Sequence, residues 1–158
     1  MVVSINNNNK TIVVTGSAGF IGFHVSHRLL KENWNVIGID SMSDYYDISL
    51  KQSREKILLE YKNYRSIHEK IEKPNMLSSL FAKERPNIII HLAAQAGVRY
   101  SFENPRSYLE SNVLGTFELL EALKKYPPNH FLLASTSSIY GANKKMPFKE
   151  TDKADHQL

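Results

Sequence analysis

The sequence predicts an α/β fold, an open, doubly wound parallel β-sheet with helices on both faces. Short apolar runs alternate along the chain with longer amphipathic runs, which is the order strand, helix, strand, helix. The apolar runs are continuous, as expected of parallel strands that are buried on both faces. A closed barrel needs eight such units, whereas this chain holds about five, so an open sheet fits better.

The positions of the elements follow from these runs and from the residues that start and stop helices. We expect strands at 11–16, 35–40, 64–69, 87–94 and 130–135, the third of which has the weakest signal. We expect helices at 20–33, 49–61, 76–85 and 105–126, and the second has the pattern of a charged amphipathic helix. Pro86 and Pro127 stop two of them, and Asn104 caps the last one ahead of a proline at its first position.

The composition excludes several kinds of protein. There is no cysteine, which excludes a disulfide scaffold and a thiolate metal site and suits a reducing cytoplasm. No apolar run approaches the ~20 residues of a membrane span, and the chain does not start like a signal peptide. The net charge of +4 comes from scattered basic residues, so we expect neither a nucleic acid nor a membrane as partner.

The chain is expected to form one domain with a short leader. We expect residues 1–9, which are polar and rich in asparagine, to be disordered, and residues 10–158 to form the domain. His24 and His27 stand three apart on one predicted helix without a visible third ligand, so we expect solvent-facing histidines and no metal site.

The most informative stretch is TGSAGFIG, residues 15–22, between the first strand and the first helix. Gly16 allows a tight turn, Gly19 lets the backbone approach a pyrophosphate, and Gly22 lets the helix pack closely on the strand. Exposed N–H groups and the helix dipole then favour the phosphate charge. The spacing is G-x-x-G-x-x-G rather than G-x-G-x-x-G, and a purely structural glycine turn is the alternative.

Asp40 closes the second strand, where an acid in such folds accepts hydrogen bonds from the adenosine ribose hydroxyls. An ordinary turn residue is the alternative interpretation. No lysine or arginine follows Asp40 before Lys51, so we expect a 2′-phosphate to meet repulsion without a compensating cation. The sequence therefore predicts NAD rather than NADP as the cofactor.

Five motifs follow one another in the chain: TGSAGFIG, the acid of VIGID, HLAAQAGVRYS, ESNVLGT and ASTSSIYG. With them the sequence resembles the extended short-chain dehydrogenases, a family of nucleotide-sugar epimerases and dehydratases, over almost its whole length. Within this family, the stretches HLAAQAGVRYS, DYYD and GANKKMPF are most similar to UDP-glucuronate 4-epimerases. The resemblance implies a Rossmann-like fold and NAD as the cofactor.

The resemblance assigns a cofactor-binding role to several positions. The implied pyrophosphate turn consists of Gly16, Gly19, Phe20, Ile21 and Gly22. Asp40 is implied to bind the ribose, and Ser135 to line the nicotinamide side. Ala93, Ala94 and Gln95 end the fourth strand, where small side chains leave room for the dinucleotide. Asn112 is implied to hydrogen-bond near the cofactor, with a capping or solvent role as the alternative.

Hydroxyl residues follow the last strand, and in an open parallel sheet ligands bind beyond the carboxyl ends of the strands. Thr136 matches the catalytic Ser/Thr of the family, which is implied to hydrogen-bond the sugar 4-oxygen. Ser137 and Ser138 stand where dehydratases of the family have their acid and base, which favours an epimerase acting on a uronic acid. A plain Ser/Thr-rich loop is the alternative. Arg99 pairs with a substrate carboxylate or diphosphate, or else forms a surface salt bridge.

The sequence departs from the family pattern in two places. Lys70 stands where the family has an acid that touches adenine, which leaves adenine recognition open. The catalytic Tyr-x-x-x-Lys pair of the family is expected only beyond Leu158. Tyr140 lies in the strand-end motif and is no substitute for this pair, because Lys144 follows four residues later with the wrong flanking pattern. We therefore expect a truncated domain, without the last strands and the C-terminal substrate domain, that is inactive alone.

The resulting hypothesis is an NAD-dependent epimerase that inverts C4 of UDP-glucuronate through a 4-keto intermediate. The alternatives are a non-catalytic NAD-binding module, a sugar-nucleotide 4,6-dehydratase and a UDP-galactose-type epimerase. The partner is then a nucleotide sugar, and the expected location is the cytoplasm. The resemblance also allows a homodimer for the full-length family members.

Overall fold

The computed structural model describes residues 10–154, so the leader expected at 1–9 lies outside the described residues. The strands are β1 (Thr11–Thr15), β2 (Asn35–Asp40), β3 (Tyr64–His68), β4 (Ile88–His91) and β5 (His130–Leu133). The helices are α1 (Phe20–Lys31), α2 (Ile48–Leu59), α3 (Met76–Glu84), α4 (Tyr100–Glu103), α5 (Pro105–Tyr108), the π-helix η1 (Leu109–Leu114), α6 (Gly115–Lys125) and the 3-10 helix η2 (Ser137–Tyr140). Within residues 10–154, no helix is long and apolar enough to cross a membrane.

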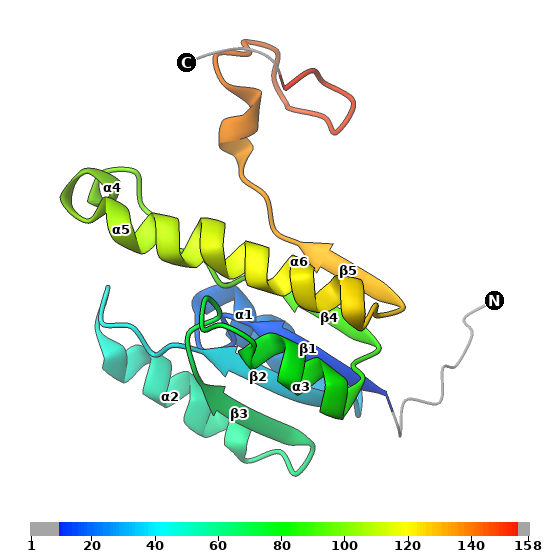
Figure 1. Cartoon of the computed structure of the whole chain (residues 1–158). Helices are drawn as coiled ribbons and strands as arrows, with labels where there is room; N and C mark the ends of the chain where they lie inside the picture. Colours follow the sequence, from blue (N-terminus) through cyan, green and yellow to red (C-terminus); the bar gives the residue numbers. More distant parts are fainter. Residues whose placement is uncertain (1–9, 155–158) are drawn as a thin grey trace.

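The five strands form one parallel sheet in the order β3-β2-β1-β4-β5 (Figure 1). This confirms the predicted open, doubly wound Rossmann-like sheet. The chain proceeds from β1 outward to β3 and then returns to place β4 on the other side of β1. The carboxyl ends of β1 and β4 therefore form the point where the strand order reverses, which is where open α/β sheets bind their ligands.

Alternate residues of the strands face two separate cores, because successive side chains of a strand point to opposite faces. On one face, Ile12, Val14 and Val36 pack with Leu30 of α1 and Leu58 of α2. On the other face, the core is made by strand residues together with α3 and α6, and it consists of Val13, Ile37, Ile39, Ile71, Leu77, Phe81, Ile89, Leu119 and Ala122. Burial on both faces explains why the strand sequences are continuously apolar.

Helix α2 differs from the charged amphipathic helix that we expected. Its residues Lys51 and Glu55 are buried, whereas Leu50 and Leu59 are about half exposed. The face turned to the sheet is thus mainly polar, and hydrogen bonds rather than apolar contacts hold much of it in place. The expectation was wrong because periodicity indicates only that a helix has two different faces. Which face is buried depends on the groups against which the helix packs, and here these groups are polar.

Two other elements differ most clearly from the predicted ones. The single helix expected at 105–126 is divided into α5, the π-helix η1 and α6. Strand β4 ends at His91, three residues earlier than expected. The Leu92 N–H is shared between the carbonyl oxygen of Thr15, at 3.2 Å, and Thr15 Oγ1, at 3.1 Å, and the Ala93 N–H donates to Thr15 Oγ1 at 3.1 Å. A side-chain hydroxyl thus takes over from the ladder at the end of this strand.

We expect the substitution Phe81→Ala to destabilise the fold by about 3–5 kcal/mol, since it empties space in the core between α3, α6 and the sheet. The Phe81 side chain is fully buried, whereas Phe117 of α6 is 55% exposed and offers a matched control. Urea unfolding of Phe81→Ala and Phe117→Ala measures the difference. Equal losses of unfolding free energy in the two variants would contradict this placement of the core.

Candidate functional site

The turn after β1 packs against the end of β4 through bare backbone. Gly16 has a φ of +72°, and a Cβ built on it would lie 2.9 Å from the Ala93 nitrogen. A Cβ on Gly22 would overlap the carbonyl oxygen of Gly16. The N–H groups of Gly16 and Ser17 both donate to the carbonyl oxygen of Ile39, at 2.7 and 3.3 Å. Gly16 and Gly22 are therefore required by the close packing of the turn.

Gly19 has a different role, because its Cβ position is largely open. The only neighbour of that position is the Gly16 carbonyl oxygen at 3.1 Å, and the backbone of Gly19 is extended. Gly19 is the N-cap of α1, no side chain caps the helix there, and its first turn contains no acid. Phe20 and Ile21 are 67% and 60% exposed. This uncapped helix start, with room beside it, fits a diphosphate.

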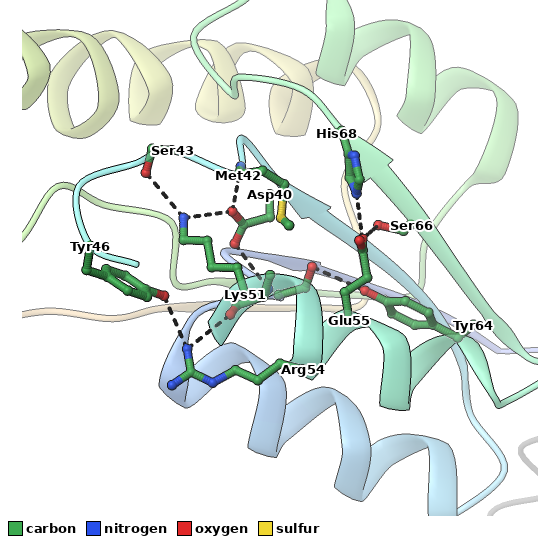
Figure 2. A network of polar contacts seen from close by, with 12 residues as sticks. Asp40, Met42, Ser43, Tyr46, Lys51, Arg54, Glu55, Tyr64, Ser66 and His68 are labelled. Atoms are coloured by element: carbon green, nitrogen blue, oxygen red, sulfur yellow. Dashed lines mark hydrogen bonds and ion pairs between the residues drawn. The ribbon is translucent and has the colours of Figure 1, made fainter. Parts of the chain in front are cut away.

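Asp40 is held at the end of β2 by three donors (Figure 2). Its Oδ2 accepts the Ala18 N–H at 3.1 Å, and its Oδ1 accepts the Met42 N–H at 2.9 Å and the Lys51 ammonium at 3.1 Å. The expectation that no cation accompanies Asp40 was wrong. Lys51 follows eleven residues later in the sequence, but helix α2 folds back and places its ammonium group on the carboxylate.

A pocket of about 170 Å³ opens along the carboxyl ends of the strands. Among the predicted cofactor residues, it is lined by Gly16, Asp40, Ala93, Ala94 and Gln95. It is also lined by residues that the sequence interpretation had not included as ligands: Ser41, Ser43, Lys51, Glu69, Lys70, Ile71, Glu72, Leu92, Ser107, Glu110 and Ser111. The other predicted residues lie outside this lining, namely Gly19, those of α1, those of the 135–138 segment, Arg99 and Asn112.

Lys70 lies in this pocket among carboxylates. Its ammonium group is 3.6 Å from Glu72 and 3.9 Å from Glu110, and its side chain is 65% exposed. Glu72, in contrast, is 14% exposed and Glu110 is 31% exposed. The departure from the family pattern at Lys70 is thus accompanied by two acids that the fold brings beside it, one of them from η1.

A chain of hydrogen bonds links β1, β4 and α6 next to the pocket. Thr15 Oγ1 already accepts two backbone N–H groups, so its proton is left to donate to His91 Nδ1 at 2.7 Å. His91 Nε2 then carries the proton and donates to Thr116 Oγ1 at 3.4 Å. His91 is 3% exposed, and its burial lowers its pKa to about 4. His91 is thus a hydrogen-bonded histidine of the core.

Asn112 contacts backbone rather than open pocket. Its Oδ1 accepts the Gln95 N–H at 2.7 Å, and its Nδ2 donates to the Gln95 carbonyl at 3.0 Å. One side chain thereby satisfies both backbone polar groups of Gln95, which follows β4. Asn112 lies in η1. A side chain of the π-helix therefore holds the loop after β4, which lines the pocket. A contact of Asn112 with the cofactor stays a prediction.

Tyrosine side chains hold the loop around Gly97, and no motif in the sequence indicated these contacts. The hydroxyl of Tyr108 donates to the carbonyl oxygens of Ala96, at 2.9 Å, and of Gly97. Gly97 has a φ of +98°, and a Cβ there would overlap the hydroxyl of Tyr45. The ring of Tyr45 in turn lies 4.7 Å from that of Tyr100. The loop between β2 and α2 thus packs on the loop after β4.

The residues predicted for the nicotinamide side, for catalysis and for the substrate are all exposed. Ser135, Thr136, Ser137 and Ser138 follow β5 in a segment that leads away from the sheet (Figure 1). Thr136 Oγ1 accepts the Ser138 N–H at 3.2 Å and so caps η2. Arg99 is exposed, and no ion pair joins it to another residue of the described range 10–154. The catalytic and substrate roles of these residues stay predictions.

Tyr140 and Lys144 do not lie on one helix. Helix η2 ends at Tyr140, and Gly141 follows with a φ of +53°. The ring of Tyr140 stacks on Phe148 at 4.5 Å. A Tyr-x-x-x-Lys pair acts as a unit when a helix brings both side chains to one face, and this stretch has no such helix.

The strand order and the pocket define a Rossmann-like α/β domain, with an uncapped helix start at the point where the strand order reverses. Residues 13–157 match the family model described as GDP-mannose 4,6 dehydratase. The chain belongs to this family of NAD-dependent epimerases and dehydratases, which confirms the resemblance.

Relatives in the family include named epimerases. The chain is 48% identical over 146 residues to a probable UDP-glucuronate 4-epimerase of Rhizobium meliloti, covering 92% of the chain and 43% of the relative. It is 47% identical over 150 residues to UDP-glucuronate 4-epimerase 4 of Arabidopsis thaliana, covering 94% and 34%. The chain thus spans less than half the length of these relatives.

A solved structure shows the same fold. The UDP-glucuronic acid 4-epimerase of Bacillus cereus, in complex with UDP-glucuronic acid and NAD, superposes with a TM-score of 0.78 at 36% identity. The match covers 85% of this chain and 43% of that one.

We expect His91 to make the stability of the fold depend on pH. The pKa of about 4 in the folded state lies below the ordinary 6.5, so the folded state binds fewer protons. Its contribution is therefore complete above about pH 6.5 and is lost as the pH falls through about 4, at roughly 1.4 kcal/mol per unit of pKa difference.

The measurement is urea unfolding at a series of pH values for the parent and for His91→Gln. The variant should lack this part of the pH dependence, whereas His24→Gln, at an exposed histidine, should retain it. Parallel pH profiles for the parent and His91→Gln would show that His91 is not buried in its neutral form.

Proposed function

We propose that the chain binds NAD and forms the cofactor-binding part of an epimerase that inverts C4 of UDP-glucuronate. The observation that carries the proposal is the uncapped start of α1, with open space at Gly19 and with Asp40 at the end of the adjacent strand. Relatives named UDP-glucuronate 4-epimerases, one solved with NAD and UDP-glucuronic acid, support both the cofactor and the sugar.

The charge of the pocket supports NAD over NADP. Its ionisable lining residues are Asp40, Lys51, Glu69, Lys70, Glu72 and Glu110. The carboxylates outnumber the ammonium groups, and Lys51 is already paired with Asp40. A 2′-phosphate entering this pocket would meet net repulsion, whereas the ribose hydroxyls of NAD would meet hydrogen-bond acceptors.

In this proposal, different residues of the chain bind different parts of NAD and of the sugar. When bound, NAD takes up and returns the hydride at C4 of the sugar. The N–H groups at the start of α1 hold the diphosphate, Asp40 holds the ribose, and Ser135 lines the nicotinamide side. Thr136 donates a hydrogen bond to the sugar 4-oxygen. Ser137 and Ser138 face the carboxylate on C5, and Arg99 pairs with a carboxylate or with the diphosphate.

A non-catalytic NAD-binding module is the second candidate. It predicts NAD binding on which the nucleotide sugar has no effect, and within the described residues Tyr140 and Lys144 do not share a helix. A 4,6-dehydratase is disfavoured, because Ser137 and Ser138 supply neither an acid nor a base at neutral pH. A UDP-galactose-type epimerase would need a sugar without a carboxylate. A cytoplasmic location and a homodimer stay predictions from the sequence and the resemblance.

We expect the chain to bind NAD and the substitution Gly19→Leu to weaken that binding by about tenfold or more. A bulky side chain at this position fills the space beside the helix start, and charge-assisted hydrogen bonds to the diphosphate are lost. Isothermal calorimetry with NAD measures the effect. Gly19→Ala, whose smaller side chain has only one close neighbour, should weaken binding less. Unchanged affinity in Gly19→Leu, or no binding by the parent, would refute the proposed cofactor site.

We expect residues 1–158 alone, incubated with NAD and UDP-glucuronate, to form no UDP-galacturonate. Proton transfer by a positioned base contributes roughly 10²–10⁴-fold to such reactions, and no helical Tyr-x-x-x-Lys pair stands within the described residues. Anion-exchange chromatography of the nucleotide sugars detects the product, with the Bacillus cereus enzyme as the positive control. Epimerisation by this chain would show that it contains its own base.

A further inference from the structure

Lys51 is buried directly against the carboxylate at the ribose end of the pocket. The side chains of Lys51 and Asp40 are 8% and 5% exposed, and both line the pocket. The ammonium group lies 3.1 Å from Asp40 Oδ1 and 3.2 Å from Ser43 Oγ (Figure 2). A buried lysine is stable only when it is paired, so the position of Lys51 depends on Asp40.

The hydrogen-bond capacity of this pair is only partly used. An ionised carboxylate offers about four lone pairs, and the three donors on Asp40 leave one of them, on Oδ2. An ammonium group has three protons, and Asp40 and Ser43 take two of those of Lys51. The ammonium group also lies over the ring of Tyr46, 5.4 Å from its centroid. A ribose placed here would therefore meet one free acceptor on Asp40 rather than two.

The hydroxyls of Ser41 and Ser43 lie in the same pocket lining, on exposed residues directly after β2. A lysine together with two hydroxyls is a set of donors that suits a phosphate group. In this chain, however, the charge of Asp40 offsets the charge of that lysine. The carboxylate and not the absence of a cation is what disfavours a phosphate on the ribose.

We propose that Lys51 is a masked phosphate-binding cation, and that the Asp40–Lys51 pair as a unit determines the choice between NAD and NADP. This inference rests on the proposed function, because it assigns the adenosine ribose of a dinucleotide to this end of the pocket. Removing the carboxylate while keeping its shape unmasks Lys51 for the 2′-phosphate of NADP.

The test compares calorimetric Kd values of NAD and NADP for the parent, Asp40→Asn and two double variants. Asp40→Asn should tighten NADP by about tenfold and weaken NAD, as expected for one charge-assisted hydrogen bond gained and one acceptor lost. Adding Lys51→Gln should abolish the gain for NADP. Adding Lys56→Gln instead removes the same charge from the exposed side of α2 and should leave the gain intact.

The outcomes separate this inference from the proposed function. Loss of the NADP gain in both double variants, or a gain that survives Lys51→Gln, would overturn the role of Lys51. NAD binding by the parent without any NADP gain in Asp40→Asn would overturn this proposal alone. A parent that binds neither dinucleotide would overturn the proposed function and this inference with it.

A second variant covers the case in which Asp40→Asn fails to fold because it leaves Lys51 buried without its partner. Lys51→Gln in the parent background keeps the repulsion from Asp40 and removes the cation that offsets it. The ratio of the NADP Kd to the NAD Kd should then rise. An unchanged ratio, with folding confirmed by circular dichroism, would overturn the proposal.

Discussion

The backbone of the glycine turn and the backbone after β4 lie so close together that no side chain fits between them. A Cβ on Gly16 would lie 2.9 Å from the Ala93 nitrogen, and the positive φ of Gly16 excludes most other residues in any case. This contact joins the carboxyl ends of β1 and β4, where the strand order reverses. This contact positions three other features: the uncapped start of α1, the carboxylate of Asp40 and the loop after β4. Each of them is connected to the glycine turn or to one of the strands that the contact joins.

Buried polar groups then fix the surroundings of this contact. Thr15, His91 and Thr116 are linked in a chain that satisfies two backbone N–H groups, and burial lowers the pKa of the histidine. Asn112, in the π-helix, forms hydrogen bonds with both the backbone N–H and the carbonyl oxygen of Gln95. Since unsatisfied polar groups are costly in a buried setting, such networks have few alternative arrangements. They give the pocket rigid walls, which a site needs if it is to hold a ligand in one orientation.

Helix α2 buries charged residues and exposes leucines, which reverses the usual distribution between core and surface. Its buried face carries Lys51 and Glu55, each paired with a partner on the sheet side, whereas Leu50 and Leu59 face outward. Replacing such pairs with apolar residues often costs no stability, so their value lies elsewhere. For Lys51, that value is its charge, which offsets the charge of Asp40 at the ribose end of the pocket.

The sequence by itself determined the alternation of strands and helices, the glycine turn and the position of Asp40. These features follow from local patterns: continuous apolar runs, helix-stopping prolines and glycines that free the backbone. The tertiary structure alone decided that Lys51 pairs with Asp40, that Glu110 joins Lys70, that Tyr45 packs on Gly97 and that a π-helix interrupts the long helix. Each of these depends on which groups are buried together after the chain has folded back on itself, and desolvation, which makes such pairings strong, has no signature in the order of residues along the chain.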